Sequence, residues 1–182
     1  MPVAAGDTDK GVPLTVLGVD PGSRSLGWGL VLERSGVLSL ADCGVIRPKG
    51  DSFSERLAFI FNALSAVAAA GRPDEAAVEM VFTHKNILSA LKLGQARGVA
   101  VAACAALGVP VFDYEPAVVK KTLVGTGQAE KSQVSFMVGR MLGVKPDWPV
   151  DAGDALACAV CRLNMRRMEL LTSGRRSARA VP

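Results

Sequence analysis

The chain has 182 residues, of which 49% are hydrophobic and 21% are charged. This composition supplies enough apolar material for one sizeable core and is typical of a single domain. The formal net charge is only +4, which excludes a protein that binds nucleic acid through bulk positive charge. Any nucleic-acid contact therefore requires a local basic patch.

The start of the chain has the composition of a disordered leader. Residues 1–13 are small and polar, and they carry Asp7, Asp9 and Lys10 where a secretory signal would have a basic and then an apolar segment. The most apolar long stretch, 98–112, is shorter than the roughly 20 residues that cross a bilayer, and a glycine and a proline interrupt it. We therefore expect a cytoplasmic protein with no membrane partner.

The four cysteines, Cys43, Cys104, Cys158 and Cys161, are scattered through hydrophobic stretches. This distribution is typical of reduced, buried thiols rather than of a disulfide framework. Cys158 and Cys161 form a C-x-x-C pair, but neither a second pair nor a histidine lies near them in the sequence. Packing in a core is therefore favoured over a zinc site.

Hydrophobic periodicity predicts an α/β fold after the leader. Strands are expected at 14–20, 26–33, 37–46, 74–81 and 109–114. Helices are expected at 54–70, with Ser54 as a possible cap, and at 86–107, 116–124, 130–142 and 150–167. Three strands in a meander followed by alternating helix and strand predict a mixed five-stranded sheet with helices on both faces. The domain then covers 14–168, and 169–182 is expected to be a basic flexible tail.

The first strand ends on a carboxylate, Asp20, directly before Pro21 and Gly22. Aspartate is depleted in strands and is costly to desolvate alone, so its position needs an explanation. A turn is one explanation, because Pro21 fixes φ and Gly22 can supply left-handed geometry. The other is that Asp20 meets further carboxylates around a cation, and the chain must then contain those partners.

Three more acids occupy positions where acids are disfavoured. Glu79 lies inside the strand expected at 74–81, and Asp151 and Asp154 lie at the head of the last helix. A spacing of three residues places Asp151 and Asp154 on one helix face, next to a long apolar run. Helix capping explains one of these two acids but does not explain both of them together with the strand acids.

Four converging carboxylates would repel each other and take up protons unless a hard cation neutralised them. Mg²⁺ accepts oxygen ligands, and two such ions about 4 Å apart are a known arrangement for phosphoryl transfer. One ion would generate the attacking hydroxide and the other would stabilise the departing oxygen. The acids therefore favour a metal-dependent site that acts on phosphate esters.

Five sequence runs occur in an order and at intervals that resemble the RuvC-type Holliday-junction resolvases. They are LGVDPGS, VEMVF, ALKLGQARGVA, VVKKTLVGTGQAEKSQV and DAGDALACAV. The resemblance covers about Leu14 to Leu163. It implies an RNase H-like fold, a two-fold symmetric homodimer and Mg²⁺-dependent cleavage of two opposed strands at a four-way DNA junction, in recombination and repair. It also implies two Mg²⁺ ions per site, with Mn²⁺ as a substitute, and suggests the branch-migration proteins RuvA and RuvB as partners.

The resemblance assigns roles to particular side chains. The catalytic and metal-binding tetrad falls on Asp20, Glu79, Asp151 and Asp154. The active-site and DNA-contacting lysines fall on Lys120 and Lys131, the aromatic wedge that enters the junction core falls on Phe82, and Lys85 is expected to contact DNA beside it. Met80 departs from the pattern, because a polar glutamine is expected beside the acid.

The residues alone leave other roles open. Lys120 and Lys131 could stabilise charge on a phosphorane or could be solvated surface lysines. Phe82 could stack on an unpaired base or could cover the edge of the core. His84, the single histidine, could bind phosphate or be solvated.

The alanine-rich helix expected at 86–107 is the candidate dimer interface, because small residues allow close approach, although burial against the sheet explains the same pattern. Three other functions remain open. One is a different RNase H-like nuclease that cleaves RNA–DNA hybrids or other branched DNA, and another is a junction-binding protein that does not cleave. The third is an actin-like nucleotide-binding module, which would need a second glycine-rich phosphate loop and a second subdomain.

Overall fold

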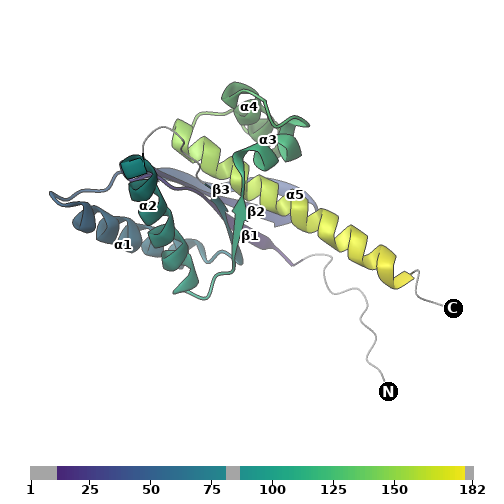
Figure 1. The fold of residues 1–182 in the computed structure, drawn as a ribbon. Coiled ribbons are helices and arrows are strands. Elements are labelled where there is room, and N and C mark those ends of the chain that lie inside the picture. Colours follow the sequence, from purple (N-terminus) through teal and green to yellow (C-terminus); the bar gives the residue numbers. More distant parts are fainter. Residues whose placement is uncertain (1–11, 81–86, 179–182) are drawn as a thin grey trace, which may run out of the picture.

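The computed structural model describes residues 12–80 and 87–178 (Figure 1). The strands are β1 (Leu14–Asp20), β2 (Leu26–Arg34), β3 (Val37–Ile46), β4 (Glu75–Glu79) and β5 (Val111–Tyr114). The helices are α1 (Phe53–Gly71), α2 (Ile87–Ala105), α3 (Pro116–Val124), α4 (Lys131–Leu142) and α5 (Val150–Ala178).

The strands form one mixed sheet in the order β3-β2-β1-β4-β5. The first three strands are antiparallel neighbours, whereas β4 and β5 continue the sheet in parallel from β1. Ser35 and Gly36 join β2 to β3 with φ angles of 52° and 81°, which is the type I′ turn that suits a two-residue hairpin. The predicted five-stranded mixed sheet is confirmed.

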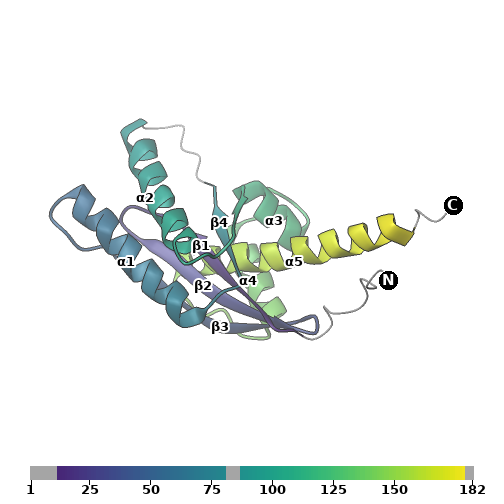
Figure 2. The same ribbon diagram turned by 90° about the horizontal axis from the view of Figure 1, so that it is seen from below.

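Helices cover both faces of the sheet, as predicted (Figures 1 and 2). Because side chains alternate along a strand, the adjacent residues Val16 and Leu17 of β1 enter different cores. Leu17 packs with α1 and α2, through residues such as Ile60. Val16 packs with α3, α4 and α5, through residues such as Leu156.

Helix α1 begins one residue after Ser52, not after Ser54 as expected. The Ser52 hydroxyl accepts a hydrogen bond from the Glu55 backbone N–H, and the Glu55 carboxylate accepts one from the Ser52 backbone N–H. This reciprocal pair is a capping box. Ser52 is therefore the residue that fixes the start of the helix.

Helix α5 is the central helix of its layer, and its residues from Ala155 to Leu163 are all buried. Small side chains such as Ala155 and Ala159 let its backbone lie close to the sheet. Cys104, Cys158 and Cys161 are buried free thiols, as predicted, and Cys43 is a half-buried free thiol. Cys158 and Cys161 are both fully buried in the core, as core packing predicts.

Helix α5 runs past its expected end at residue 167 and continues to Ala178 (Figure 1). Glu169 forms an ion pair with Arg162, and the Thr172 hydroxyl donates to the carbonyl oxygens of Met168 and Glu169. Leucine, methionine, arginine and glutamate are good helix formers. These interactions extend the helix beyond the sheet.

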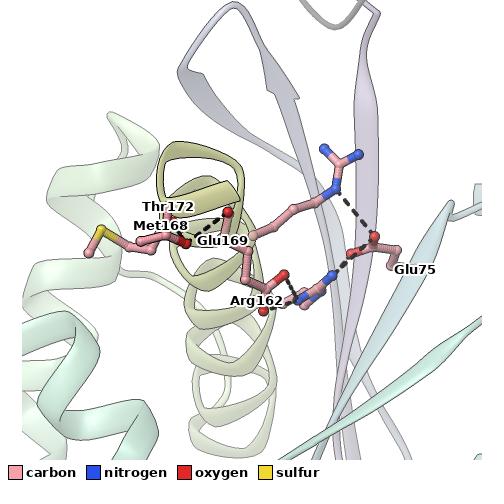
Figure 3. Close-up of polar contacts among 6 residues, drawn as sticks. Glu75, Arg162, Met168, Glu169 and Thr172 are labelled. Atoms are coloured by element: carbon pink, nitrogen blue, oxygen red, sulfur yellow. Dashed lines mark hydrogen bonds and ion pairs between the residues drawn. The ribbon is translucent and has the colours of Figure 1, made fainter. Parts of the chain in front are cut away.

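A buried ion pair ties α5 to β4 (Figure 3). The Arg162 side chain is 5% exposed, and its Nε and Nη2 atoms donate to the two Glu75 carboxylate oxygens at 2.6 and 3.3 Å. Its guanidinium carbon lies 3.6 Å from the centre of the Phe112 ring, and Arg166 also contacts Glu75. A bidentate, stacked arginine in this environment fixes the position of the helix along the strand.

Helices α1 and α2 are each long and apolar enough, by length and composition alone, to cross a membrane. Each helix packs one face on the sheet, α1 through Ile60 and Leu64 and α2 through Ala96 and Ala100. Amphipathic helices that cover a sheet meet the same criterion, so the finding is weak as an indication of a membrane span.

Candidate active site

The two strand acids are neighbours at one end of the sheet. Strands β1 and β4 are parallel, and Val19 pairs with Val78 in their register. The next residue of each strand is an acid, so Asp20 and Glu79 end adjacent strands at the same level. The sequence predicted each acid, and the parallel pairing brings them together.

The two helix acids reach this place because α5 lies unusually close to β1 and β2. A Cβ atom added at Gly18 would lie 1.8 Å from the carbonyl oxygen of Ala155. A Cβ added at Gly27, the residue that pairs with Asp20, would lie 1.9 Å from the carbonyl oxygen of Asp151. These two glycines therefore allow the first turns of α5 to lie directly against the strands.

The loop after Asp20 contributes a contact that the sequence did not predict. The Ser25 hydroxyl donates a hydrogen bond to Oδ2 of Asp151. Gly22 does not adopt the left-handed φ that was expected. It is needed for close approach instead, because a Cβ there would lie 1.9 Å from the Ser25 carbonyl oxygen. A serine directly before β2 was the only available signal.

The four acids influence one another electrostatically. Burial and the negative charges of Glu79, Asp154 and Asp151 raise the pKa of Asp20 to about 8. The pKa of Glu79 is also raised, mainly by burial and further by Asp154. The contact between the Asp20 and Glu79 carboxyls raises the pKa of Asp20 and lowers that of Glu79. The acids thus form one coupled group.

Both predicted lysines lie beside this group. Lys131, the first residue of α4, donates from Nζ to Oδ2 of Asp154, and this hydrogen bond raises the pKa of Lys131. Lys120, on α3, is near enough that its positive charge, like that of Lys131, lowers the pKa of Glu79. Two cations from separate helices therefore approach the four carboxylates.

The donor set suits a hard divalent cation. Four carboxylates supply oxygen ligands of the kind that Mg²⁺ prefers, and the raised pKa of Asp20 shows that the protein alone does not neutralise the group. Within residues 12–80 and 87–178, no three His, Cys, Asp or Glu side chains are already placed as a metal-binding group. Protein groups engage two of the acids instead, since Ser25 bonds Asp151 and Lys131 bonds Asp154.

A cavity of about 170 Å³ adjoins Asp154 and Lys131. The hydroxyl-bearing Ser132 and Ser135 of α4 line it together with Trp148. The cavity forms between α4 and the first turn of α5, so no local sequence pattern indicated it. It provides space for part of a ligand that binds at the acids.

Three residues named from the sequence are not placed here. Phe82, Lys85 and His84 lie outside the described residues, and their expected roles stay predictions. Met80 is described and half-buried, and its backbone N–H donates to the Tyr114 carbonyl oxygen at 2.8 Å. Its backbone thus extends the pairing of β4 with β5.

The sheet order, the helices on both faces and the carboxylates at the sheet end together define the class of the protein, which is that of the RNase H-like nucleases. The model of one family, crossover junction endodeoxyribonuclease RuvC, matches residues 16–162. The chain therefore belongs to the RuvC family of crossover junction endodeoxyribonucleases. Nucleases of this family generally depend on a divalent metal ion.

Curated relatives carry the same family name. A RuvC from Oleidesulfovibrio alaskensis is 64% identical over 161 residues, which are 88% of this chain and 97% of the relative. A RuvC from Nitratidesulfovibrio vulgaris strain Hildenborough is 62% identical over 158 residues, which are 87% of this chain and 95% of that relative. The similarity thus covers nearly the whole length of both relatives.

Solved structures agree in fold. RuvC of Thermus thermophilus is 34% identical, with a TM-score of 0.79, over 86% of this chain and 97% of that one. The T. thermophilus RuvC in complex with a Holliday junction substrate has a TM-score of 0.80 and is also 34% identical, over 86% of this chain and 96% of that one. The predicted RNase H-like fold is confirmed.

Proposed function

We propose that this protein is a structure-selective DNA endonuclease that resolves Holliday junctions by paired, symmetric, Mg²⁺-dependent nicks in recombination and repair. The observation that carries the proposal is the coupled group of Asp20, Glu79, Asp151 and Asp154 with two lysines beside it. The family and the T. thermophilus structure with a junction support the choice of substrate.

The four carboxylates would hold two Mg²⁺ ions, or Mn²⁺ in their place. Bound metal supplies an activated water and stabilises the oxygen that leaves, which yields a 5′-phosphate and a 3′-hydroxyl. Ser25 orients Asp151 through its hydroxyl, and the close contact at Gly27 fixes the backbone of Asp151. The protein thus contributes a rigid set of oxygen ligands.

The two lysines would act on the substrate phosphate. Lys131 lies against Asp154, so its ammonium group can hold a phosphate that binds there and can neutralise the charge that develops in the transition state. Lys120 reaches the Glu79 side of the site from another helix. Together they would position the scissile phosphate between metal and protein.

A homodimer follows from two equivalent cuts on a two-fold junction. Helix α2 supports this interface, because Ile87, Leu88 and Leu91 are 87%, 69% and 58% exposed. The small, exposed residues Gly94 and Gly98 continue the same helix face and allow close backbone approach. A second copy would cover this apolar face.

Further expectations rest on the family. Phe82 would enter the junction core and Lys85 would contact DNA beside it. RuvA and RuvB would be partners in branch migration. A cytoplasmic location accords with a role on chromosomal DNA.

The test is incubation of the purified protein with a labelled four-way junction, a matching duplex and an RNA–DNA hybrid, each with and without Mg²⁺. Symmetric metal-dependent nicks on the junction alone, absent in Asp20→Asn, are the expected result. Hybrid cleavage would keep the metal site but change the substrate. Junction binding without nicks would indicate an architectural protein.

A further inference from the structure

A pair of cations from different helices meets on one aromatic ring near the active-site end of the sheet. The Arg56 guanidinium carbon of α1 and the Lys92 Nζ of α2 each lie 5.8 Å from the centre of the Phe53 ring. This distance is within the range of cation–π attraction. Two positive charges, one from α1 and one from α2, therefore lie beside the Phe53 ring.

The strand register puts this place at the same end of the sheet as the acids. Asp20 pairs with Gly27, and the adjacent Leu26 pairs with Ile46, the last residue of β3. The chain then runs through a short loop directly into α1. Figures 1 and 2 show α1 and α2 side by side with their first turns toward the end where α5 begins.

Three more cations lie in the loops at this end, and all three are exposed. Arg24 belongs to the loop that connects β1 and β2, and Arg47 and Lys49 follow β3. Among the described residues, none of these three forms an ion pair, and neither do Arg56 and Lys92. Five positive charges at one end of the sheet, without an ion-pair partner in the described part of the chain, favour a polyanionic ligand.

The acids in the same segments do not cancel this charge. Asp51 and Glu55 are the two in residues 47–56. The Glu55 carboxylate accepts hydrogen bonds from the backbone N–H groups of Asp51 and Ser52, at 2.7 and 3.0 Å, and is held by the helix cap. Outside the tetrad, the surface thus carries an excess of three positive charges, five minus two.

We propose that Arg24, Arg47, Lys49, Arg56 and Lys92 form a phosphate-binding surface that holds a duplex arm of the DNA beside the active site. The inference rests on the proposed function. It places the contact with the DNA arm on the face of the sheet that α1 and α2 cover, opposite the face that carries Lys120 and Lys131. The contact is with phosphates, so it does not depend on base sequence.

Salt dependence measures such contacts directly. Each phosphate contact contributes about 0.9 to the slope of log affinity against log salt concentration. Removal of two contacts, in Arg56→Gln/Lys92→Gln, lowers the slope by about 1.8. Between 50 and 200 mM salt, the double variant then loses roughly tenfold less affinity than the natural protein.

The experiment titrates full-length protein onto a labelled four-way junction and a labelled duplex in EDTA, at several salt concentrations. Arg34→Gln is the matched control, because Arg34 is exposed at the other end of the sheet, and it should leave the slope unchanged. Arg47→Gln/Lys49→Gln, in an exposed loop, repeats the test where Arg56→Gln could disturb the fold. Each double variant should bind both DNAs more weakly and with the smaller slope.

Equal slopes for the natural protein, both double variants and the control would overturn the proposal. Displacement of the DNA by poly-glutamate at equal charge concentration would also overturn it, in favour of an acidic polypeptide. Binding in EDTA involves no cleavage, so these outcomes are separate from the nicking test. Loss of nicking with the slopes as expected would reject the proposed function alone.

Discussion

Substitution of Gly27 by alanine tests whether close contact between α5 and β2 sets the geometry of the site. The new Cβ would lie 1.9 Å from the carbonyl oxygen of Asp151 and 2.3 Å from its carbonyl carbon. Both are backbone atoms, which cannot rotate away. The start of α5 must therefore retreat by about 1 Å before the contact reaches even 3.0 Å.

A displacement of this size at a catalytic group costs about 10²-fold in rate. We therefore expect Gly27→Ala to nick a four-way junction about 100-fold more slowly in single-turnover assays at saturating protein and Mg²⁺. Overpacking should also cost about 1–3 kcal/mol of stability. Binding of Mn²⁺, measured by calorimetry, should weaken in parallel, because Asp151 moves with the helix.

Gly29→Ala is the matched control on the same strand. Its Cβ would meet the Leu156 side chain, at 2.5 Å from Cδ2, and this side chain can repack. We expect a similar loss of stability with nicking and Mn²⁺ binding close to those of the natural protein. If Gly27→Ala nicked junctions and bound Mn²⁺ as well as the natural protein does, the idea that this contact positions Asp151 would be refuted.

Three further predictions concern charge and hydrogen bonding. The pKa of Asp20 rises from 3.8 for an unperturbed aspartate to about 8 in the folded protein, so the metal-free protein should lose stability as pH rises from about 4 to 8. Asp20→Asn should flatten this loss in melting curves recorded in EDTA, and parallel curves would contradict the reasoning. Ser25→Ala should require more Mg²⁺ and nick roughly tenfold more slowly, because Asp151 loses its donor; an unchanged Mg²⁺ dependence would exclude this role. Arg162→Met should cost about 1.5–3 kcal/mol in urea unfolding, because it removes the bidentate partner of Glu75 and leaves only Arg166 in contact with this carboxylate. Arg162→Met/Glu75→Met should cost less than the sum of the two single changes; additive losses would show that the pair is not coupled.

Local patterns predicted most of the fold. The observed bounds of β1, β3 and α3 are those expected, because alternating apolar residues and glycine or proline turns define them within a few residues of sequence. The four acids were also noticeable in the sequence, since each lies beside or within an apolar run. The parallel pairing of β1 with β4 brings Asp20 and Glu79 together, whereas Asp151 and Asp154 also need the close packing of α5 on β1 and β2.

Contacts between distant residues could not be predicted in this way. Ser25 and Asp151 are 126 positions apart, and Arg162 and Glu75 are 87 apart. No periodicity links such pairs, and an arginine or a serine is common in any loop or helix. The continuation of α5 past residue 167 was a different miss, because its contacts, such as the ion pair of Glu169 with Arg162, lie within two turns of the helix.

The bond between Arg162 and Glu75 also constrains chain length. Glu75 and Glu79 are four residues apart on β4, a span of about 13 Å. Asp154 and Arg162 are eight residues apart on α5, a span of about 12 Å. The segment 75–79 of β4 and the segment 154–162 of α5 therefore have nearly the same length. The ion pair connects them at one end, and the acids of the site lie together at the other.

An added residue in either segment would make the two lengths unequal. One extra residue between Asp154 and Arg162 would turn the helix by about 100° and advance it by about 1.5 Å. The chain could then keep the ion pair or the acidic site, but not both. Insertions in this family member should therefore be tolerated in the loops around the sheet and rejected between these two anchor points.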